Sequence, residues 1–132
     1  MIDKNKLKLA KFLAKKNMAP HEYGVNDCMT FAIEWHDHNH GTRQLSKIYR
    51  KYHSLATAFK FYRNFLSVNG WLKANGYQEV DDIADGDFLV QTVDRLPQVW
   101  IYFNGALYTI HEQRGLTAVS QDLVQDYTVW RR

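Results

Sequence analysis

The feature that most constrains the fold is a change in the spacing of apolar residues near Gly86. Before this glycine, apolar residues recur at helical spacings. After it, the segments DFLVQTV, QVWIYFNGALYTI, GLTAVS and YTVWRR are rich in β-branched and aromatic residues. Asn104-Gly105, between two such runs, is typical of a tight β-hairpin turn, so the second half should form an antiparallel meander. Helices followed by strands predict an α+β domain with the helices packed on one face of the sheet.

The first half should contain four helices, over residues 4–17, 28–40 and 54–66 and, more briefly, around residues 71–75. Asp3 can cap the first helix, which should end before Pro20. Asn26 or Asp27 can cap the second helix, and Gly41 is its natural terminator. Each boundary is therefore predicted from residues next to it in the chain.

The chain has 132 residues, of which 45% are hydrophobic, and it should fold as one globular domain. Its single cysteine excludes an internal disulfide and leaves no CxxC pair for a zinc site. No apolar run approaches the length of a membrane span. The N-terminal segment lacks the uninterrupted apolar core and cleavage site of a signal peptide, so we expect no export signal.

The first predicted helix carries a lysine face opposite an apolar face. The lysine face consists of Lys4, Lys8, Lys11 and Lys15, each three or four residues from the next. The apolar face consists of Ile2, Leu9 and Leu13. A solvated helix surface is favoured over a nucleic-acid patch, because the rest of the chain is not notably basic and the net charge is only +3. Nucleic acid is therefore not an expected partner.

Cys28 begins the second predicted helix, and its position allows two interpretations. The unpaired amides of a first helical turn favour a thiolate, as a nucleophile requires. Cys28 also continues the apolar stripe of Phe31, Ala32 and Trp35, where a cysteine is commonly a packed thiol. No base adjoins Cys28 in the sequence, so local residues alone favour the packed thiol.

Histidines could supply a base or bind a metal. His36 and His40 are four residues apart on one helix and could share a metal ion, but no third ligand is placed by the sequence. We therefore predict neither a metal nor a cofactor. His111 ends the second strand of the Asn104-Gly105 hairpin, where a side chain can face helices packed on the sheet. His21 and His53 lie in connections and indicate nothing specific.

The motifs GxxDC at a helix start, GD before a strand, VxIY within a strand and IH before a Gly-hydrophobic run occur here in that order. This order resembles the NlpC-type superfamily of papain-like cysteine peptidases. It is most similar to a small phage-encoded branch that is associated with tail or other virion proteins. The resemblance extends from Tyr23 to Arg131. It implies a papain-like fold with one NlpC-like domain over residues 1–132, in which residues 1–20 add a basic helix to a core of residues 21–132.

The resemblance also assigns positions to site residues. It places Cys28 at the position of the nucleophile and His111 at that of the third, orienting residue. Gln98 stands in QVWIY where active members have HVGIY, whose histidine is the general base. A glutamine amide cannot accept a proton near neutral pH, so the usual pair of cysteine and histidine is missing. Trp100 replaces the glycine of that motif, which suggests a filled or reshaped groove.

Two functions follow from the resemblance. The first is a degenerate, non-catalytic member that serves as a tail-associated structural or host-contact protein of a phage particle. It would be assembled in the bacterial cytoplasm and contact other virion proteins. The second is an active cysteine hydrolase of the peptide stems of bacterial peptidoglycan, with Cys28 as nucleophile and His111 or His53 as base. A weaker third possibility is a nucleic-acid-binding accessory protein, suggested by the lysine face.

Overall fold

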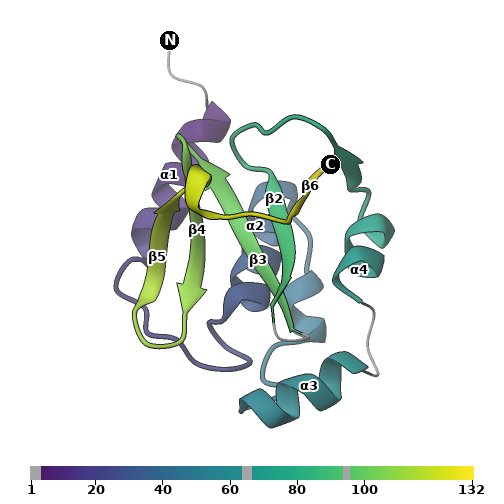
Figure 1. Ribbon diagram of the computed structural model, residues 1–132. Coiled ribbons are helices and arrows are strands. Elements are labelled where there is room, and N and C mark those ends of the chain that lie inside the picture. Colours follow the sequence, from purple (N-terminus) through teal and green to yellow (C-terminus); the bar gives the residue numbers. More distant parts are fainter. Residues whose placement is uncertain (1–3, 64–66, 94–95) are drawn as a thin grey trace.

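The computed structural model describes residues 4–63, 67–93 and 96–132, and the chain forms four α-helices and six strands there (Figure 1). The α-helices are α1 (Lys4–Lys16), α2 (Cys28–His40), α3 (Leu55–Arg63) and α4 (Val68–Ala74). Two short 3₁₀ helices are η1 (Gln44–Lys47) and η2 (Gln121–Leu123). The strands are β1 (Gln78–Val80), β2 (Phe88–Val93), β3 (Leu96–Phe103), β4 (Ala106–His111), β5 (Gly115–Ser120) and β6 (Thr128–Arg131). In the described ranges no helix is long and apolar enough to cross a membrane.

All six strands join one antiparallel sheet in the order β1-β6-β2-β3-β4-β5. The α+β class is confirmed, but the predicted meander is wrong at one end. β2 to β5 follow one another, whereas β6 returns to pair with β2 on one side and with β1 on the other. β1 was not predicted, because it has three residues and two of them are exposed. The predicted helix end at residues 64–66 and the Asp3 cap lie outside the described residues.

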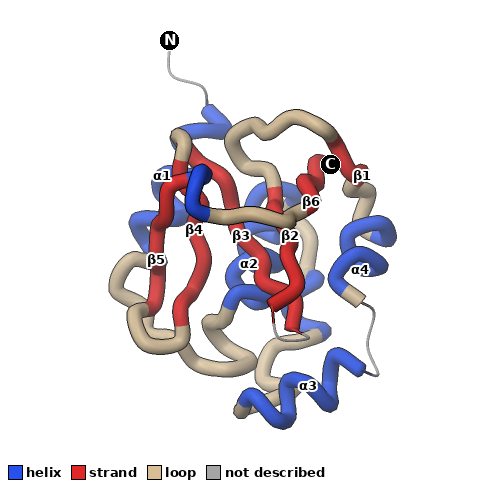
Figure 2. Tube along the Cα trace, in the orientation of Figure 1, coloured by secondary structure: helices blue, strands red, loops and turns tan. Residues whose placement is uncertain are grey.

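The two faces of the sheet have different covers, as Figure 2 shows. Helix α2 packs on one face, where Phe31 and Ile33 meet Val99 and Ile101 of β3 in the main core. The segment between β5 and β6 crosses the other face, where a smaller cluster forms around Leu89, Leu107 and Val129. Alternate residues of each central strand therefore enter different cores.

Helix α2 has the boundaries that its neighbouring residues predict. Asp27 is its N-cap and forms a capping box with Thr30. Gly41 ends it with a left-handed backbone, φ 67°. Helix α1 buries Leu9 and Leu13, together with Phe12, which stacks on Phe31 of α2 with ring centroids 5.6 Å apart. The basic first helix is thus packed into the same core as α2.

Candidate functional site

The turn before α2 places Asp27 and Cys28 at the N-terminus of the helix. The Asp27 carboxylate accepts hydrogen bonds from the amides of Met29 (3.0 Å) and Thr30 (2.9 Å), so the carboxylate replaces the missing partners of the first turn. Gly24, which begins this turn, has φ +80°, and a Cβ atom there would be 2.1 Å from the Tyr52 carbonyl oxygen. Local backbone geometry therefore accounts for the glycine and the aspartate of the GxxDC motif, whether or not Cys28 reacts.

The second oxygen of Asp27 binds two further donors. It accepts hydrogen bonds from the Gly24 amide (2.9 Å) and from the hydroxyl of Tyr52 (2.6 Å), and Tyr52 is in turn 2.8 Å from the hydroxyl of Tyr62 on α3. Burial and the Asp27 carboxylate raise the pKa of both tyrosines, which remain protonated donors. Asp27 is 6% exposed and its two carboxylate oxygens accept four hydrogen bonds, so the carboxylate is not free to serve as a base.

Strands β3 and β4 separate at the end of the sheet that lies over Cys28. Their pairing covers only Ile101–Phe103 with Ala106–Tyr108, although both strands continue beyond it, and Figure 1 shows them diverging. In the widened part, Thr109 of β4 donates its hydroxyl to the Val99 carbonyl oxygen at 2.9 Å. The Cys28 sulfur lies 3.8 Å from the Pro97 carbonyl oxygen, so the thiol lies beside the part of β3 that does not pair with β4. Helix α2 thus begins under the gap between the two strands.

The environment of Cys28 opposes thiolate formation. Burial and, next, the neighbouring Asp27 carboxylate together raise the pKa of the thiol to about 12. Hydrogen bonds from the backbone of Val99 and of the first helical turn lower the pKa, but less strongly. The helix-start effect that favours a thiolate is present and is outweighed by desolvation and like charge.

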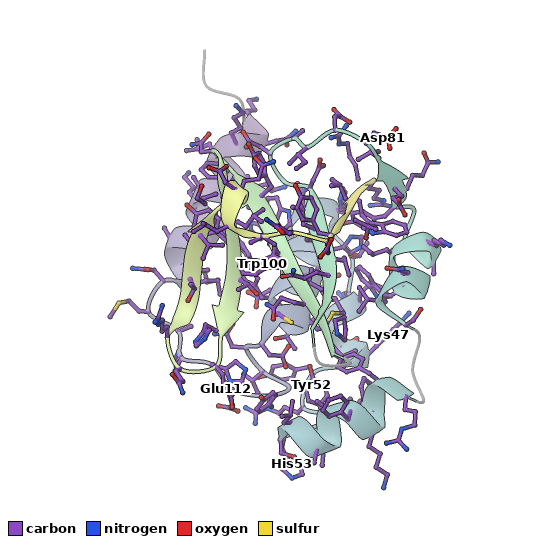
Figure 3. The ribbon with its side chains drawn as sticks, in the orientation of Figure 1. Lys47, Tyr52, His53, Asp81, Trp100 and Glu112 are labelled. Atoms are coloured by element: carbon purple, nitrogen blue, oxygen red, sulfur yellow. The ribbon has the colours of Figure 1, made fainter. Side chains whose placement is uncertain are left out.

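A cavity of about 650 Å³ opens at this end of the sheet and includes Cys28 in its wall. One side is formed by α3, the opposite side by β3 and β4, and the rim by the turns before α2 and after β4. The α3 side includes Leu55, Ala58, Phe59 and Tyr62, and the side of β3 and β4 includes Pro97, Gln98, Trp100, Thr109 and Ile110. The rim includes His21, Tyr23, His111 and Glu112. Figure 3 shows Tyr52 and Glu112 at this same end of the molecule.

Gln98 and Trp100 are held by polar contacts within the sheet. The Gln98 amide donates to the Thr109 hydroxyl at 2.7 Å, and the Trp100 indole donates to the side-chain oxygen of Gln91 at 2.8 Å. Both residues line the cavity that contains Cys28. Neither forms a hydrogen bond to the sulfur among the described contacts.

His111 lies on the cavity rim, but its ring is engaged elsewhere. The side chain is exposed, and its Nδ1 atom accepts a hydrogen bond from the Gln113 amide at 3.0 Å. At this end of β4, Ile110 packs into the main core, whereas His111 is exposed at the cavity rim. The cause is strand alternation, which directs neighbouring side chains to opposite faces. Cys28 and His111 therefore share a cavity without a hydrogen bond between them in the described structure.

Two residues at the rim were not predicted from the sequence. The ring of Tyr23 lies edge-on to that of His21, with centroids 4.5 Å apart. Burial and, next, the nearby Glu112 carboxylate raise the pKa of Tyr23. The interaction between Tyr23 and Glu112 joins the turn before α2 to the turn after β4. Tyr23 and Glu112 are 89 positions apart in the chain, so no local sequence pattern could have indicated it.

The other histidines lie away from this cavity. His53 is exposed, is not part of the cavity wall and lies at the periphery beside α3 (Figure 3). His36 and His40 have ring centroids 5.0 Å apart on α2, and His36 is hydrogen-bonded to the Tyr77 hydroxyl at 2.7 Å. In the described part of the chain, no group of three or more histidine, cysteine, aspartate or glutamate side chains could hold a metal ion.

The Gly86-Asp87 dipeptide has a structural role at the start of β2. Asp87 is 3% exposed, and its carboxylate accepts hydrogen bonds from Arg131 Nε at 2.8 Å and Nη2 at 2.6 Å. This two-point contact ties the beginning of β2 to the end of β6. Asp87 also accepts a hydrogen bond from the Ala84 amide at 2.8 Å, which shapes the loop before the strand.

Comparison with known proteins gives one match. A family described as a domain of unknown function (DUF6950) matches residues 2–131, which is nearly the whole chain. Neither the curated proteins nor the solved structures contain a significant match.

Proposed function

The chain belongs to the DUF6950 family, and we propose that it is a non-catalytic relative of the NlpC-type papain-like peptidases that serves as a tail-associated structural or host-contact protein of a phage particle. Support for the relationship comes from the order of the GxxDC, GD, VxIY and IH motifs. An α-helix that begins at the cysteine and packs on an antiparallel sheet is compatible with the proposed papain-like fold. The phage assignment rests on the sequence resemblance alone.

The observation that carries the non-catalytic assignment is the state of Cys28. Burial and the Asp27 carboxylate raise the pKa of this half-buried thiol, so its thiolate fraction at pH 7 falls below the few per cent of an ordinary cysteine. A cysteine nucleophile normally has a depressed pKa or a base in contact with it. Here the sulfur contacts the Pro97 carbonyl, and Gln98, at the position of the family's base, cannot accept its proton.

In this proposal the cavity beside Cys28 serves for binding. Its walls carry the aromatic rings of Tyr23, Phe59, Tyr62 and Trp100, which offer large apolar contact area with polar ends. Such a surface suits an extended segment of another virion protein. Peptidoglycan is the second partner that the family resemblance suggests.

The alternative is an active hydrolase of cell-wall peptide stems. The observation in its favour is that Cys28 and His111 line one open cavity, and a bound substrate could bring them together. In that mechanism, Cys28 Sγ would attack the amide carbonyl while His111 accepts the thiol proton and later protonates the leaving amine. Water would then cleave the resulting thioester, which releases the carboxylic acid and restores the thiol. His53 lies outside the cavity wall, which makes it the poorer candidate for the base.

The rate of Cys28 alkylation as a function of pH separates the two functions. Because Cys28 is the only cysteine, the signal needs no site assignment, and the urea-unfolded chain is the control with an ordinary thiol. We expect the folded protein to react more slowly than the unfolded chain at every pH up to about 9. A folded-state rate that stays high below pH 7 would contradict the proposal.

Two further measurements test the function itself. Digestion of purified peptidoglycan should release no peptide products beyond those seen with Cys28→Ala, whereas products that depend on Cys28 would support the hydrolase. The phage assignment predicts that mass spectrometry of purified particles finds the protein at constant stoichiometry in the tail fraction. Its absence from particles would exclude the virion role without bearing on catalysis.

A further inference from the structure

We propose that the chain associates with a second copy of itself through the free edge of β5, by antiparallel pairing around a two-fold axis at Ala118. β5 is the last strand of the sheet, and β4 is its one neighbour among the described strands (Figure 1). Its outer edge presents unpaired backbone groups, which are a template for another strand.

The sequence of β5 lacks the devices that normally protect such an edge. The strand GLTAVS contains no charged residue and no proline, and it is six residues long. The opposite edge of the sheet is different, because β1 has only three residues and carries Glu79 on an exposed position. Proteins commonly protect edge strands with lysines, prolines or short length. Only the β1 edge is protected by such means.

The register of a self-pairing is limited by backbone geometry. Neighbouring residues of a strand turn their backbone groups to opposite edges, so a strand that pairs with its own copy places one residue opposite itself. With the axis at Ala118, Thr117 faces Val119 and Leu116 faces Ser120 of the other copy. The small, exposed Ala118 side chain lies at the axis, where the two copies approach most closely. The β-branched pair of Thr117 and Val119 is a favourable cross-strand contact.

Charges at the two ends of β5 favour this register. Arg114 precedes the strand and Asp122 follows it, both are exposed, and neither forms an ion pair within the described structure. An axis at Ala118 brings Arg114 of each copy toward Asp122 of the other, which makes two opposite-charge contacts. Shifting the axis to Thr117 or Val119 would place Arg114 toward Ser120 or Val124 instead.

The same register brings together the two most exposed large apolar side chains of the described residues. Met18 is 88% exposed and Leu123 is 76% exposed. The carbonyl oxygen of Ala19 would be 2.9 Å from a Cβ atom at Gly115, the first residue of β5. Met18, which precedes Ala19, therefore lies near the start of β5. Leu123 lies in η2, just past the other end of the strand. Antiparallel pairing therefore places Met18 of one copy near Leu123 of the other at each end of the interface.

This interface is small, and its strength should reflect that. Pairing of one six-residue edge with flanking apolar contacts falls at the low end of specific protein interfaces. We therefore expect a reversible dimer whose proportion rises with concentration. The interface lies at the β5 edge, two strands away from β3, which forms part of the Cys28 cavity wall, and it does not depend on the function proposed above.

The test is sedimentation velocity of the full chain over a range of concentrations. Ala118→Lys should weaken dimerisation at least about tenfold, because it places two lysines opposite each other at the axis. Ala74→Lys, at an exposed position on α4, is the matched control and should behave like the wild type. A wild-type protein that stays monomeric at every concentration, or equal effects of the two lysine variants, would overturn the proposal.

Charge reversal tests the register and does not depend on Ala118. Arg114→Asp and Asp122→Arg should each weaken the dimer about tenfold, since each converts two attractive contacts into repulsive ones. The double variant should restore dimerisation to within about threefold of the wild type, because the pairs are re-formed with opposite sense. Failure of the double variant to recover would refute the Ala118 axis. Far-ultraviolet circular dichroism checks that every variant is folded.

Discussion

Tyr52→Phe removes a hydroxyl that connects Tyr62 of α3 to Asp27 in the turn before α2. In the wild type this hydroxyl donates to the buried Asp27 carboxylate at 2.6 Å and lies 2.8 Å from the Tyr62 hydroxyl. A phenylalanine keeps the ring and its contacts with Phe61 and Tyr62. The change therefore isolates the polar contribution at a site that is 3% exposed.

The free energy of unfolding should fall by about 2 kcal/mol. Hydrogen bonds to charged acceptors contribute about 1.5–3 kcal/mol each, and the variant leaves the Asp27 carboxylate with one donor fewer in a buried place. For a chain of 132 residues this corresponds to a decrease in Tm of about 7 °C. Tyr62→Phe breaks only the bond between two neutral hydroxyls, so it should cost about 1 kcal/mol.

Urea denaturation measured by tryptophan fluorescence is the assay. The m-value should be the same in all variants, so that a change in midpoint reports stability. Tyr49→Phe is the matched control, because Tyr49 is 40% exposed and its ring lies under Arg50, a contact that does not need the hydroxyl. If Tyr52→Phe loses no more stability than Tyr49→Phe, the hydrogen bond from Tyr52 to Asp27 does not stabilise the fold as we predict.

Three further outcomes are expected. Gly24→Ala should lower the free energy of unfolding by more than about 3 kcal/mol or prevent folding, because a Cβ atom would be 2.1 Å from the Tyr52 carbonyl oxygen. Gly41→Ala is the comparison, because the space around Gly41 is open, and it should lower the free energy of unfolding by about 1 kcal/mol in the same urea assay. Burial lowers the pKa of His36 to about 4, so His36 binds a proton more tightly in the unfolded chain than in the folded protein. The free energy of unfolding should therefore fall by up to about 3 kcal/mol as the pH decreases from 6.5 to 4. Urea midpoints over that range should show this slope, and an unchanged slope in His36→Gln would exclude His36 as its cause. If the proposed relationship to the NlpC-type peptidases is correct, Gln98→His supplies a base and should raise the rate of Cys28 alkylation at pH 7 about tenfold or more, and Gln98→Leu should not.

Local chemistry determined most of the secondary structure of this protein. The Asp27 cap and the left-handed Gly41 bound α2 because both act on backbone groups within a few residues of themselves. The strands from Phe88 onward follow from β-branched and aromatic runs and from the Asn104-Gly105 turn. The identity of Cys28, Gln98 and His111 as candidates also came from the sequence, and these residues do line one cavity.

Only the tertiary structure decided how those residues behave. The return of β6 between β1 and β2 is a choice of partner between distant segments, and a strand's own residues do not encode its neighbour. The chemical state of Cys28 depends on burial, on Asp27 and on the gap between β3 and β4, which brings Pro97 to the sulfur across 69 positions of sequence. Helix position alone favours a thiolate, but desolvation is a property of the packed molecule and acts more strongly here.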